Sequence, residues 1–451
     1  MGFSPTGSTG PWTRRPSDGS VEVRVRRTPY KVGEVTLEYG SSRARATTVA
    51  IDDPGPLDRF LPESGPYSAF IRRDEGFVAL GEVARFETDF ATAADVWWDE
   101  IRQQIDHDSE LPGVAGTGPL AVGTFTFDPD RSRRSSVLTV PRTIIGRRGG
   151  QAWITMMEPR GPITLPPPGE PLVAPVDVQL RGGSLSEAAW ADVVAGVIER
   201  IRDAKVHKVV LARDLLARAA APLDLRHLYR QLLHRYDMTW CYLVDGAIGA
   251  TPELLVRRMG GLVTSRVLAG TISADPEHTD TLSKAAELAR SEKDISEHAF
   301  AVDSVAKALG PYCQAMNVPE IPSVIPLPNV LHLATDVTGV ASPEVSSLAL
   351  AGALHPSAAV CGTPTHLALD IINEVEGLDR GRYAGPVGWM DLQGDGEWGI
   401  ALRGGHVLPE RPEEIRLFAG AGIVADSRPD AELAETNAKL IPMLQALGLA
   451  P

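Results

Sequence analysis

Two segments, far apart in the chain, carry acidic side chains at the spacing of one helical face. The charged residues are Lys293, Asp294 and Glu297 in the first segment, and Glu432, Glu435 and Lys439 in the second. Residues three or four apart lie on one side of a helix. Two such helices that face one cavity supply three or four carboxylates to a hard cation such as Mg²⁺. Taken alone, each face also fits a solvated, ion-paired helix surface, and spacing does not show that the two helices meet.

Other sequence patterns that resemble cofactor sites are weaker. The run Gly420–Ala425 fits G-x-G-x-x-A after a strand, but Asp426–Pro429 delays the helix that a dinucleotide site needs. We expect its small residues to bring backbone N–H groups close to a substrate instead. A Ca²⁺ loop that began at Asp391 would have Gln393 at its third position and no glutamate at its closing position, so the turn Gly394–Trp398 predicts a hairpin. The histidines form no H-x-x-x-H pair or His/Cys cluster, so zinc is not indicated.

Charge and cysteine content restrict the class of protein. The net charge is −14 and the 44 basic residues form no long run, which argues against nucleic acid or an anionic membrane surface as the main partner. Cys241, Cys313 and Cys361 are far apart and odd in number, so we expect no disulfide framework and a cytoplasmic location. No apolar stretch is long enough to span a membrane. An acidic protein that binds an acidic substrate needs a local cationic pocket or a metal.

The first part of the chain predicts strands more than helices. Residues 1–20 are rich in Ser, Gly and Pro and predict a flexible start. From about residue 21 to 160, short strands dominate, with one helix expected near Ala91–Ile105. The segment Gly161–Pro175 is rich in proline and predicts an extended linker, which is the best internal boundary.

The second part of the chain mixes helices and strands. Ser184 and Glu187 predict a capping box at the start of a helix. The expected elements that follow are a strand over 207–212, a helix over 225–235, a strand over 240–244, one long helix over 283–309, a hairpin around 394–396 and a closing helix from Pro429. There is no steady alternation of strand and helix, so we predict the α+β class.

Ten motifs in a fixed order resemble one known family. They are His207–Arg213, Gly249–Glu253, Leu268–Thr271, Ser291–His298, His332–Thr335, His355–Pro364, Arg380–Gly385, Ala401–Arg403, Gly420–Gly422 and Glu432–Lys439. This order resembles the chorismate-utilising enzymes, which include the anthranilate, aminodeoxychorismate, isochorismate and salicylate synthases. The resemblance is specific as a set and covers about residues 185–445.

The resemblance implies a large α+β sandwich in which two antiparallel sheets pack together, with helices outside and the site between the sheets. It implies one chorismate-binding domain over residues 21–451. Residues 21–175 are its weakly matching N-terminal half, and residues 185–445 are the core that carries the motifs. The proline-rich segment is then a crossing within one domain.

The same resemblance implies a role for each matching position. Glu297 and Glu435 resemble direct Mg²⁺ ligands, with Glu432 and Asp294 in or near the metal shell; several relatives have Glu at the position of Asp294. The residues that resemble substrate contacts are Tyr383 and Arg403 at a carboxylate, Gly270, Thr271, Lys439, the backbone of Gly420, Ala421 and Gly422, and His332 and Ala359 near the ring. Arginine suits the carboxylate because its planar fork binds both oxygens.

Three positions separate the members of this family. Lys208 resembles the lysine that the water-using members have at this position. The members that use ammonia lack it. Ala269 replaces the nucleophilic lysine of aminodeoxychorismate synthases, so that covalent route is absent. Ala359 resembles the residue that isochorismate synthases have at this position. Salicylate and anthranilate synthases tend to have threonine there. The resemblance therefore implies Mg²⁺-dependent isomerisation of chorismate to isochorismate.

The expected reaction adds water at C2 of chorismate and removes the C4 hydroxyl. Lys208 takes a proton from the attacking water and Glu253 protonates the departing hydroxyl. Mg²⁺ is expected at the ring carboxylate. The alternatives that stay open are salicylate synthase, anthranilate synthase component I and a non-catalytic chorismate-binding protein. We expect chorismate as the small-molecule partner, a monomer or weak homodimer, and a product that enters menaquinone or siderophore biosynthesis.

Overall fold

The computed structural model describes residues 43–159, 161–203, 206–273, 281–327 and 330–449. Within these ranges, the side chains of Thr271, Lys293 and Glu297 are among those that are not described. The flexible start predicted for residues 1–20 lies outside the described residues. All described residues belong to one compact unit. None of its described helices combines the length and apolar character needed to cross a bilayer.

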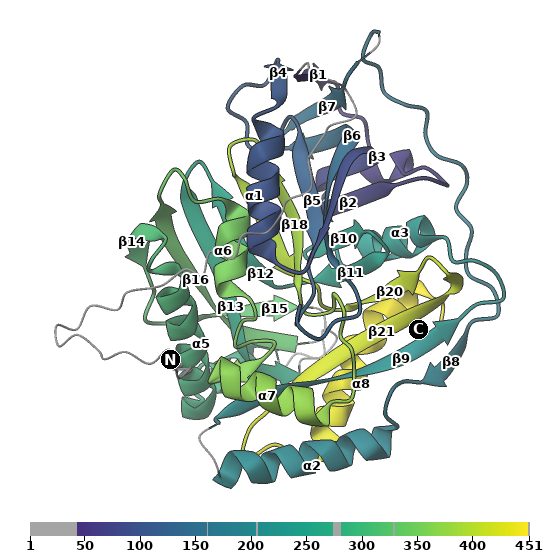
Figure 1. Ribbon diagram of the computed structural model, residues 1–451. Coiled ribbons are helices and arrows are strands. Elements are labelled where there is room, and N and C mark those ends of the chain that lie inside the picture. Colours follow the sequence, from purple (N-terminus) through teal and green to yellow (C-terminus); the bar gives the residue numbers. More distant parts are fainter. Residues whose placement is uncertain (1–42, 160, 204–205, 274–280, 328–329, 450–451) are drawn as a thin grey trace, which may run out of the picture. The chain divides into compact units, whose positions relative to one another are not determined.

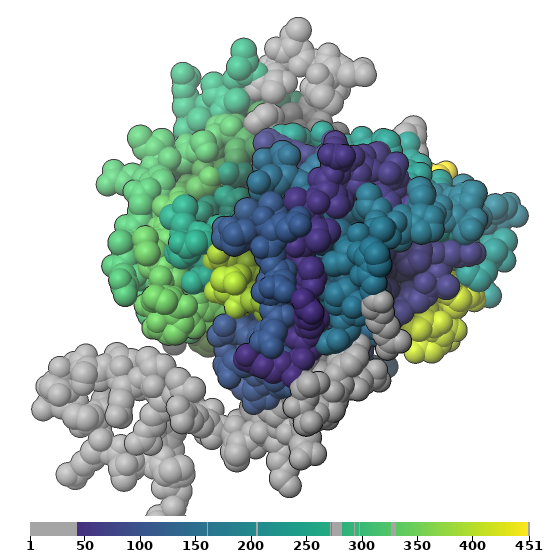
Figure 2. Space-filling model, turned by 90° about the horizontal axis from the view of Figure 1, so that it is seen from above, coloured from purple at the N-terminus to yellow at the C-terminus, as the bar shows by residue number. Residues whose placement is uncertain are grey.

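The described strands form one hydrogen-bonded network, which is antiparallel throughout except where β1 pairs with β4. At one end lie β4 (Ile105–Ser109), β1 (Ala44–Ile51), β7 (Gln151–Met157) and β6 (Ser136–Arg148), side by side in that order. Figure 2 shows β1 as a purple stripe between its two bluer neighbours. Strand β6 then pairs with both β3 (Glu75–Thr88) and β5 (Leu120–Thr124), so the network divides there into two branches.

We call the two parts the β9 branch and the β16 branch. The β9 branch continues from β3 through β2 (Tyr67–Arg72), β10 (Trp240–Val244), β11 (Ala247–Thr251), β20 (Gly404–Leu408) and β21 (Arg411–Ile423) to β9 (Lys208–Arg218), which also pairs with β8 (Gln179–Gly182) and β17 (Gly362–Thr363). The β16 branch continues from β5 through β18 (Pro386–Asp391), β19 (Gly396–Ile400), β12 (Leu254–Met259) and β13 (Leu262–Ser273) to β16 (Val330–Ala341), which also pairs with β14 (Cys313–Asn317) and β15 (Ser323–Leu327). The predicted α+β class with two antiparallel sheets is confirmed, and the two sheets are continuous through β6.

Large apolar side chains fill the space between the branches. Tyr242 and Phe77 from the β9 branch and Trp389 and Val387 from the β16 branch belong to one buried cluster. The rings of Phe77 and Trp389 meet edge to face, with centroids 6.1 Å apart, an arrangement that aromatic pairs prefer. Removing these surfaces from water holds the two sheets face to face and fixes where their ends meet.

The helices cover the outer faces and carry much of the site. They are η1 (Leu57–Phe60), α1 (Ala91–Arg102), α2 (Glu187–Asp203), α3 (Leu225–Arg235), α4 (Thr281–Leu288), α5 (Glu292–Leu309), α6 (Ser347–Leu354), α7 (Thr365–Val375) and α8 (Pro429–Ala446). In Figure 1, α8 is drawn in yellow and lies against β21, whereas α5 lies beside β13 and β16. One helix that carries predicted metal ligands therefore packs on each branch.

Two helix predictions need correction. The helix predicted as continuous over 283–309 is interrupted, because Ser291 caps a new helix by accepting a hydrogen bond from the Asp294 N–H. The cap of α2 is Ser186, whose hydroxyl accepts from the Ala189 N–H at 3.2 Å. Ser184, the predicted cap, binds Asp214 on β9 instead. In both places several Ser and acidic residues compete for the cap, and tertiary contacts decide among them.

The proline-rich segment 161–175 contains no helix or strand, as predicted. Its backbone is held to the rest of the unit at two points: the Gly169 N–H donates to the carbonyl of Arg59 at 2.7 Å, and the Val173 N–H donates to the Asp224 carboxylate at 3.1 Å. The segment therefore runs along η1 and the start of α3.

Candidate active site

A cavity of about 330 Å³ lies where the ends of the two branches meet α8 and α5. Among the predicted site residues, those that line it are Lys208, Glu253, Gly270, Asp294, His332, Ala359, Tyr383, Arg403, Gly420, Gly422, Glu432, Glu435 and Lys439. The side chains of Thr271 and Glu297 are outside the described part of the structure. The structure thus brings together most of the residues that the motifs singled out, although they span more than half of the chain.

Glu253 and Arg403 occupy two short links that join the branches near the cavity. Glu253 lies between β11 of the β9 branch and β12 of the β16 branch, and Arg403 lies between β19 and β20, which again belong to different branches. The backbone of Arg403 has a φ of 50°, a left-handed conformation that costs a non-glycine residue free energy and that clusters at functional sites. The chain therefore passes from one branch to the other at both residues. No local sequence pattern predicts such a crossing.

Lys208 begins β9, and its neighbours on the cavity wall are Val210 and Ala212. Alternate residues of a strand point to the same face, so these three residues share the cavity side while Val209 and Leu211 are buried behind them. The predicted alternation around Lys208 is confirmed.

The glycines of the GAG motif leave space for two neighbouring side chains. A Cβ atom on Gly422 would lie 2.7 Å from Cε of Lys208, and one on Gly420 would lie 3.2 Å from the Tyr383 hydroxyl. Ala421 points to the opposite face of β21 and is fully buried. The structure thus explains the small residues by the room that they leave for Lys208 and Tyr383. The backbone contact with substrate that was predicted for this motif stays a prediction.

Glu253 has the most unusual acid–base property in the cavity. Burial raises the pKa of its carboxyl to about 7, although the charges of Lys208, Lys439 and Arg403 act in the opposite direction. A carboxylic acid with a pKa near neutrality is protonated often enough to donate a proton and is a sufficiently strong acid to do so. The site therefore holds a group suited to general acid catalysis.

Three other side chains of the cavity, those of Tyr383, His332 and Arg403, keep fixed protonation states near neutral pH. Burial raises the pKa of the Tyr383 hydroxyl to about 12, and its ring stacks on Phe418 with centroids 5.0 Å apart, so Tyr383 is an oriented hydrogen-bond donor. Burial, together with Arg403 and Lys439, lowers the pKa of His332 to about 4, so its ring is neutral. Burial lowers the pKa of Arg403, but an arginine stays charged in a protein.

The carboxylates of the two predicted metal-binding helices face the same cavity. Asp294 on α5 and Glu432 and Glu435 on α8 all line it. Glu435 forms an ion pair with Lys439 at 2.5 Å, and the Lys439 ammonium donates to the Gly420 carbonyl at 2.8 Å. Burial opposes ionisation of Glu435, but Lys439, Arg403 and Lys208 together hold its pKa below the usual range. Helices α5 and α8 therefore face the same cavity, which the spacing of their acidic residues could not show.

These oxygen donors suit a hard cation such as Mg²⁺, which prefers carboxylates and water. Among the residues that the structure describes, no three acidic, His or Cys side chains are close enough together to hold a metal ion. Glu435 is instead turned to Lys439, and Asp294 is hydrogen-bonded to Ser291. The donor chemistry fits Mg²⁺, and the predicted ligand set stays a prediction.

Gly270 and His298 hold α5 against the sheet, and of these two the sequence reasoning missed His298. Strand β13 has a bulge at Gly270, whose φ is +78°. A Cβ atom on this glycine would lie 3.1 Å from the Asp294 Cβ, so the glycine allows α5 to pack close to the strand. His298 is buried behind it, and its ring nitrogens lie 3.1 Å from the Ala269 carbonyl and 2.7 Å from the Thr335 hydroxyl. In the sequence, His298 ends the Ser291–His298 motif without a predicted role.

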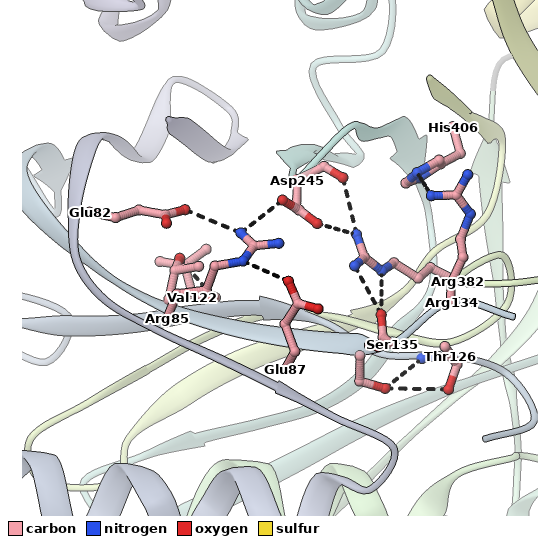
Figure 3. A network of polar contacts seen from close by, with 12 residues as sticks. Glu82, Arg85, Glu87, Val122, Thr126, Arg134, Ser135, Asp245, Arg382 and His406 are labelled. Atoms are coloured by element: carbon pink, nitrogen blue, oxygen red, sulfur yellow. Dashed lines mark hydrogen bonds and ion pairs between the residues drawn. The ribbon is translucent and has the colours of Figure 1, made fainter. Parts of the chain in front are cut away.

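Arg382, also missed, anchors the loop that carries Tyr383. Its guanidinium contacts the Asp245 carboxylate at 2.6 Å and the Ser135 carbonyl at 2.9 Å. Asp245 forms a second ion pair with Arg85 at 3.0 Å, and Figure 3 shows its carboxylate between the two guanidinium groups. The R-G-R-Y motif contained the signal, since Arg382 immediately precedes the tyrosine.

Comparison with known proteins agrees with this geometry. A family model described as a chorismate binding enzyme matches residues 173–448. Isochorismate synthase DhbC of Bacillus subtilis is 41% identical over a match that covers 56% of this chain and 66% of that protein, just under two thirds of its length. The vibriobactin-specific isochorismate synthase of Vibrio cholerae is 37% identical, with 73% of this chain and 80% of that protein covered.

A solved structure shares the fold. The menaquinone-specific isochorismate synthase MenF from Escherichia coli superimposes with a TM-score of 0.75 over 90% of this chain and 95% of that chain, at 23% sequence identity. At this identity the likeness establishes the fold alone. The family match covers all of the cavity residues named above, from Lys208 to Lys439. With the ordered motifs, the fold and the family match in agreement, this chain belongs to the chorismate-binding enzyme family.

Proposed function

We propose that the protein is an isochorismate synthase, which converts chorismate to isochorismate. The observation that carries the proposal is the joint presence of Lys208 and Glu253 in one cavity, with the pKa of Glu253 raised to about 7. A base and an acid are the two groups that the exchange of one hydroxyl position for another requires. The relatives named above as isochorismate synthases support the proposal.

The reaction balances without a redox partner. In the proposed step, neutral Lys208 accepts a proton from a water molecule as the water oxygen bonds to C2 of chorismate. The ring double bonds shift, and the C4–O bond breaks as Glu253 gives its proton to the leaving hydroxyl. One water enters and one water leaves, so chorismate and isochorismate are isomers. Afterwards, a proton passes from Lys208 to Glu253 through solvent to restore both groups.

The cationic side chains would hold the dianionic substrate. Arg403 and the Tyr383 hydroxyl are the donors proposed for one carboxylate, since a planar guanidinium binds both oxygens and Tyr383 keeps its proton below pH 12. Lys439 adds a second positive group, whose ammonium lies at the Gly420 carbonyl of β21. This local charge offsets the net charge of −14, which would otherwise repel the substrate.

Glu297, Glu435, Glu432 and Asp294 are the residues proposed to hold Mg²⁺. When bound, Mg²⁺ would neutralise the ring carboxylate and draw electron density toward it. In the described structure, Glu435 contacts Lys439, so metal binding would exchange one cationic partner of this carboxylate for another.

The test is product analysis by chromatography after incubation with chorismate, with Mg²⁺ and with a chelator. Isochorismate alone is expected, and the chelator is expected to stop its formation. Salicylate with free pyruvate would show salicylate synthase activity, and anthranilate formed from added ammonia would show anthranilate synthase activity. Binding of chorismate without any product would overturn the catalytic proposal. Relatives are named for both menaquinone and vibriobactin, so the assay follows isochorismate itself.

A further inference from the structure

A second cavity, of about 400 Å³, has four arginines among its ten lining residues, and we call it the arginine cavity. It is formed by the turn between β2 and β3, the start of β10, and the adjoining ends of β12 and β19. Its charged residues are Arg72, Arg73, Arg148, Arg257, Glu75 and Glu397. Four positive groups thus face two negative ones, in a chain whose net charge is −14. None of these residues lines the active-site cavity.

Two of the arginines are fixed on aromatic rings. The guanidinium carbon of Arg72 lies 4.0 Å from the centre of the Trp240 ring, and Nε of Arg72 donates to the Met238 carbonyl at 2.9 Å. Arg148 lies over Trp389 at 4.9 Å. A guanidinium held by stacking keeps its remaining N–H groups oriented, so it loses less conformational freedom when it binds a ligand.

The acidic groups do not balance these arginines. Glu397 is shared by Arg148 and Arg257, each at 3.5 Å. Among the described residues, no carboxylate comes within ion-pair distance of Arg72 or Arg73. Burial, followed by the charges of Arg73 and other nearby arginines, lowers the pKa of Arg72 to about 10. The positive charges therefore destabilise one another, and a bound anion would relieve that repulsion.

We propose that this cavity is a binding site for a small oxyanion, the carboxylate or phosphate group of a metabolite. Carboxylates and phosphates match the planar donor pairs of arginine. The site is separate from the proposed catalytic cavity and does not depend on the proposed function. Arg72, Arg73 and Arg257 are the proposed ligands, and Glu397 limits the affinity by competing for Arg257.

The test is calorimetric titration of the full-length protein with inorganic phosphate and, separately, with citrate, at low ionic strength. Saturable binding of at least one anion is expected for the wild type. Arg72→Gln is expected to weaken it by roughly tenfold, the effect of losing one charge-assisted hydrogen bond. Arg73→Gln removes an exposed charge and is expected to weaken it by a smaller factor without affecting the fold, as its circular dichroism spectrum will check.

Two controls locate the binding. Arg235→Gln changes an exposed arginine on α3 that does not line this cavity, and it is expected to leave the affinity unchanged. Arg403→Gln removes a cation of the catalytic cavity and is expected to leave it unchanged as well. The proposal is overturned if neither anion binds, if Arg235→Gln weakens binding as much as Arg72→Gln does, or if only Arg403→Gln abolishes it. Phosphate binding without citrate binding identifies the ligand group as phosphate, and the reverse result identifies carboxylate.

Discussion

The catalytic cavity and the arginine cavity show how burial decides what a charged pocket does. In the catalytic cavity, burial raises the pKa of Glu253 to about 7 against the opposing effect of Lys208, Lys439 and Arg403. In the arginine cavity, the charged groups are four arginines, which keep their protons near neutral pH, and the carboxylates of Glu75 and Glu397. The first cavity contains a proton that moves near neutral pH, whereas the second contains only fixed charges. The first is therefore equipped for chemistry and the second for binding alone.

The same contrast appears in how the charges are paired. In the catalytic cavity, Lys439 is held by Glu435 and by the Gly420 carbonyl. In the arginine cavity, Arg72 is held by a ring and a backbone carbonyl, which fix its position without cancelling its charge. Mutations that abolish turnover should therefore fall in the first cavity, while mutations in the second should leave turnover unchanged.

Replacing the proposed base tests this contrast most strongly. Lys208→Ala is expected to lower kcat by about 10³-fold, within the range of about 10²–10⁴ that general acid–base groups contribute. Chorismate binding should persist, since Arg403 and Tyr383 remain. Steady-state kinetics and calorimetric titration with chorismate measure the two effects. Arg73→Gln, in the other cavity, serves as the control with unchanged kcat, and a Lys208→Ala enzyme with near-normal kcat would remove the proposed base.

Glu253→Gln tests the proposed acid and is expected to lower kcat by about 10²-fold. The protonated form of Glu253 is the active one, so the wild-type rate should fall as pH rises through about 7. The glutamine variant should lack that decrease, because its amide does not titrate. A pH–rate profile of both enzymes measures this, and an unchanged high-pH limb in the variant would assign the titration to another group.

The same pKa shift makes a prediction about stability. Because burial raises the pKa of Glu253 from 4.5 to about 7, the folded protein holds this proton more tightly than the unfolded chain does. Folding stability should therefore fall as pH rises between these two values and stay reduced above them. Glu253→Gln should raise Tm relative to the wild type at about pH 8, and by less at about pH 5. Thermal unfolding followed by circular dichroism measures the difference, and an equal shift at both pH values would contradict the burial argument.

Local patterns predicted some elements at their observed bounds and missed others for physical reasons. The helix over 225–235 and the strand over 240–244 match α3 and β10, because their apolar periodicity is uninterrupted. The predicted helix over 283–309 is divided, because the hydroxyl of Ser291 satisfies an N–H of the new helix. The apolar periodicity continues across the cap, so it does not show that α4 ends at Leu288 and α5 begins at Glu292.

The composition of the site was predicted from ordered motifs, but its construction was not. That α5 and α8 meet at one cavity depends on strand pairings such as β13 with β16 and β21 with β9. These pairings join distant segments and leave no local mark in the sequence. The positions of Glu253 and Arg403 in links between the branches, and the supporting contacts of His298 and Arg382, were likewise visible only once the strands were paired.

Gly422→Ala tests how closely the catalytic cavity is fitted to its lysine. The added Cβ would lie 2.7 Å from Cε of Lys208, so the flexible lysine must move. We expect kcat to fall by roughly tenfold, because a displacement of about 1 Å is costly in a proton-transfer geometry. Gly196→Ala is the matched control, since a Cβ there meets nothing within 4 Å. Equal kcat values for both variants would show that Lys208 needs no defined position, which would weaken its assignment as the base.

The smallest effect is expected at Asp245, outside both cavities. Asp245→Asn removes the charge between Arg85 and Arg382, so Arg382 loses its ionic partner while keeping its contact with Ser135. The loop that carries Tyr383 should loosen, and KM for chorismate should rise by roughly two- to fivefold with little change in kcat, because positioning rather than proton transfer is affected. Steady-state kinetics measure this split.

Asp53→Asn is the matched control for that variant, because Asp53 pairs with Arg147 at 2.7 Å and its side chain is 68% exposed. Exposed ion pairs contribute little, so KM should not change there. Asp245→Glu keeps the charge and should restore most of the wild-type KM. If Asp245→Asn instead lowers kcat and leaves KM unchanged, the network around Arg382 acts on the chemical step itself. In that case a residue outside the catalytic cavity would affect proton transfer as well as substrate position.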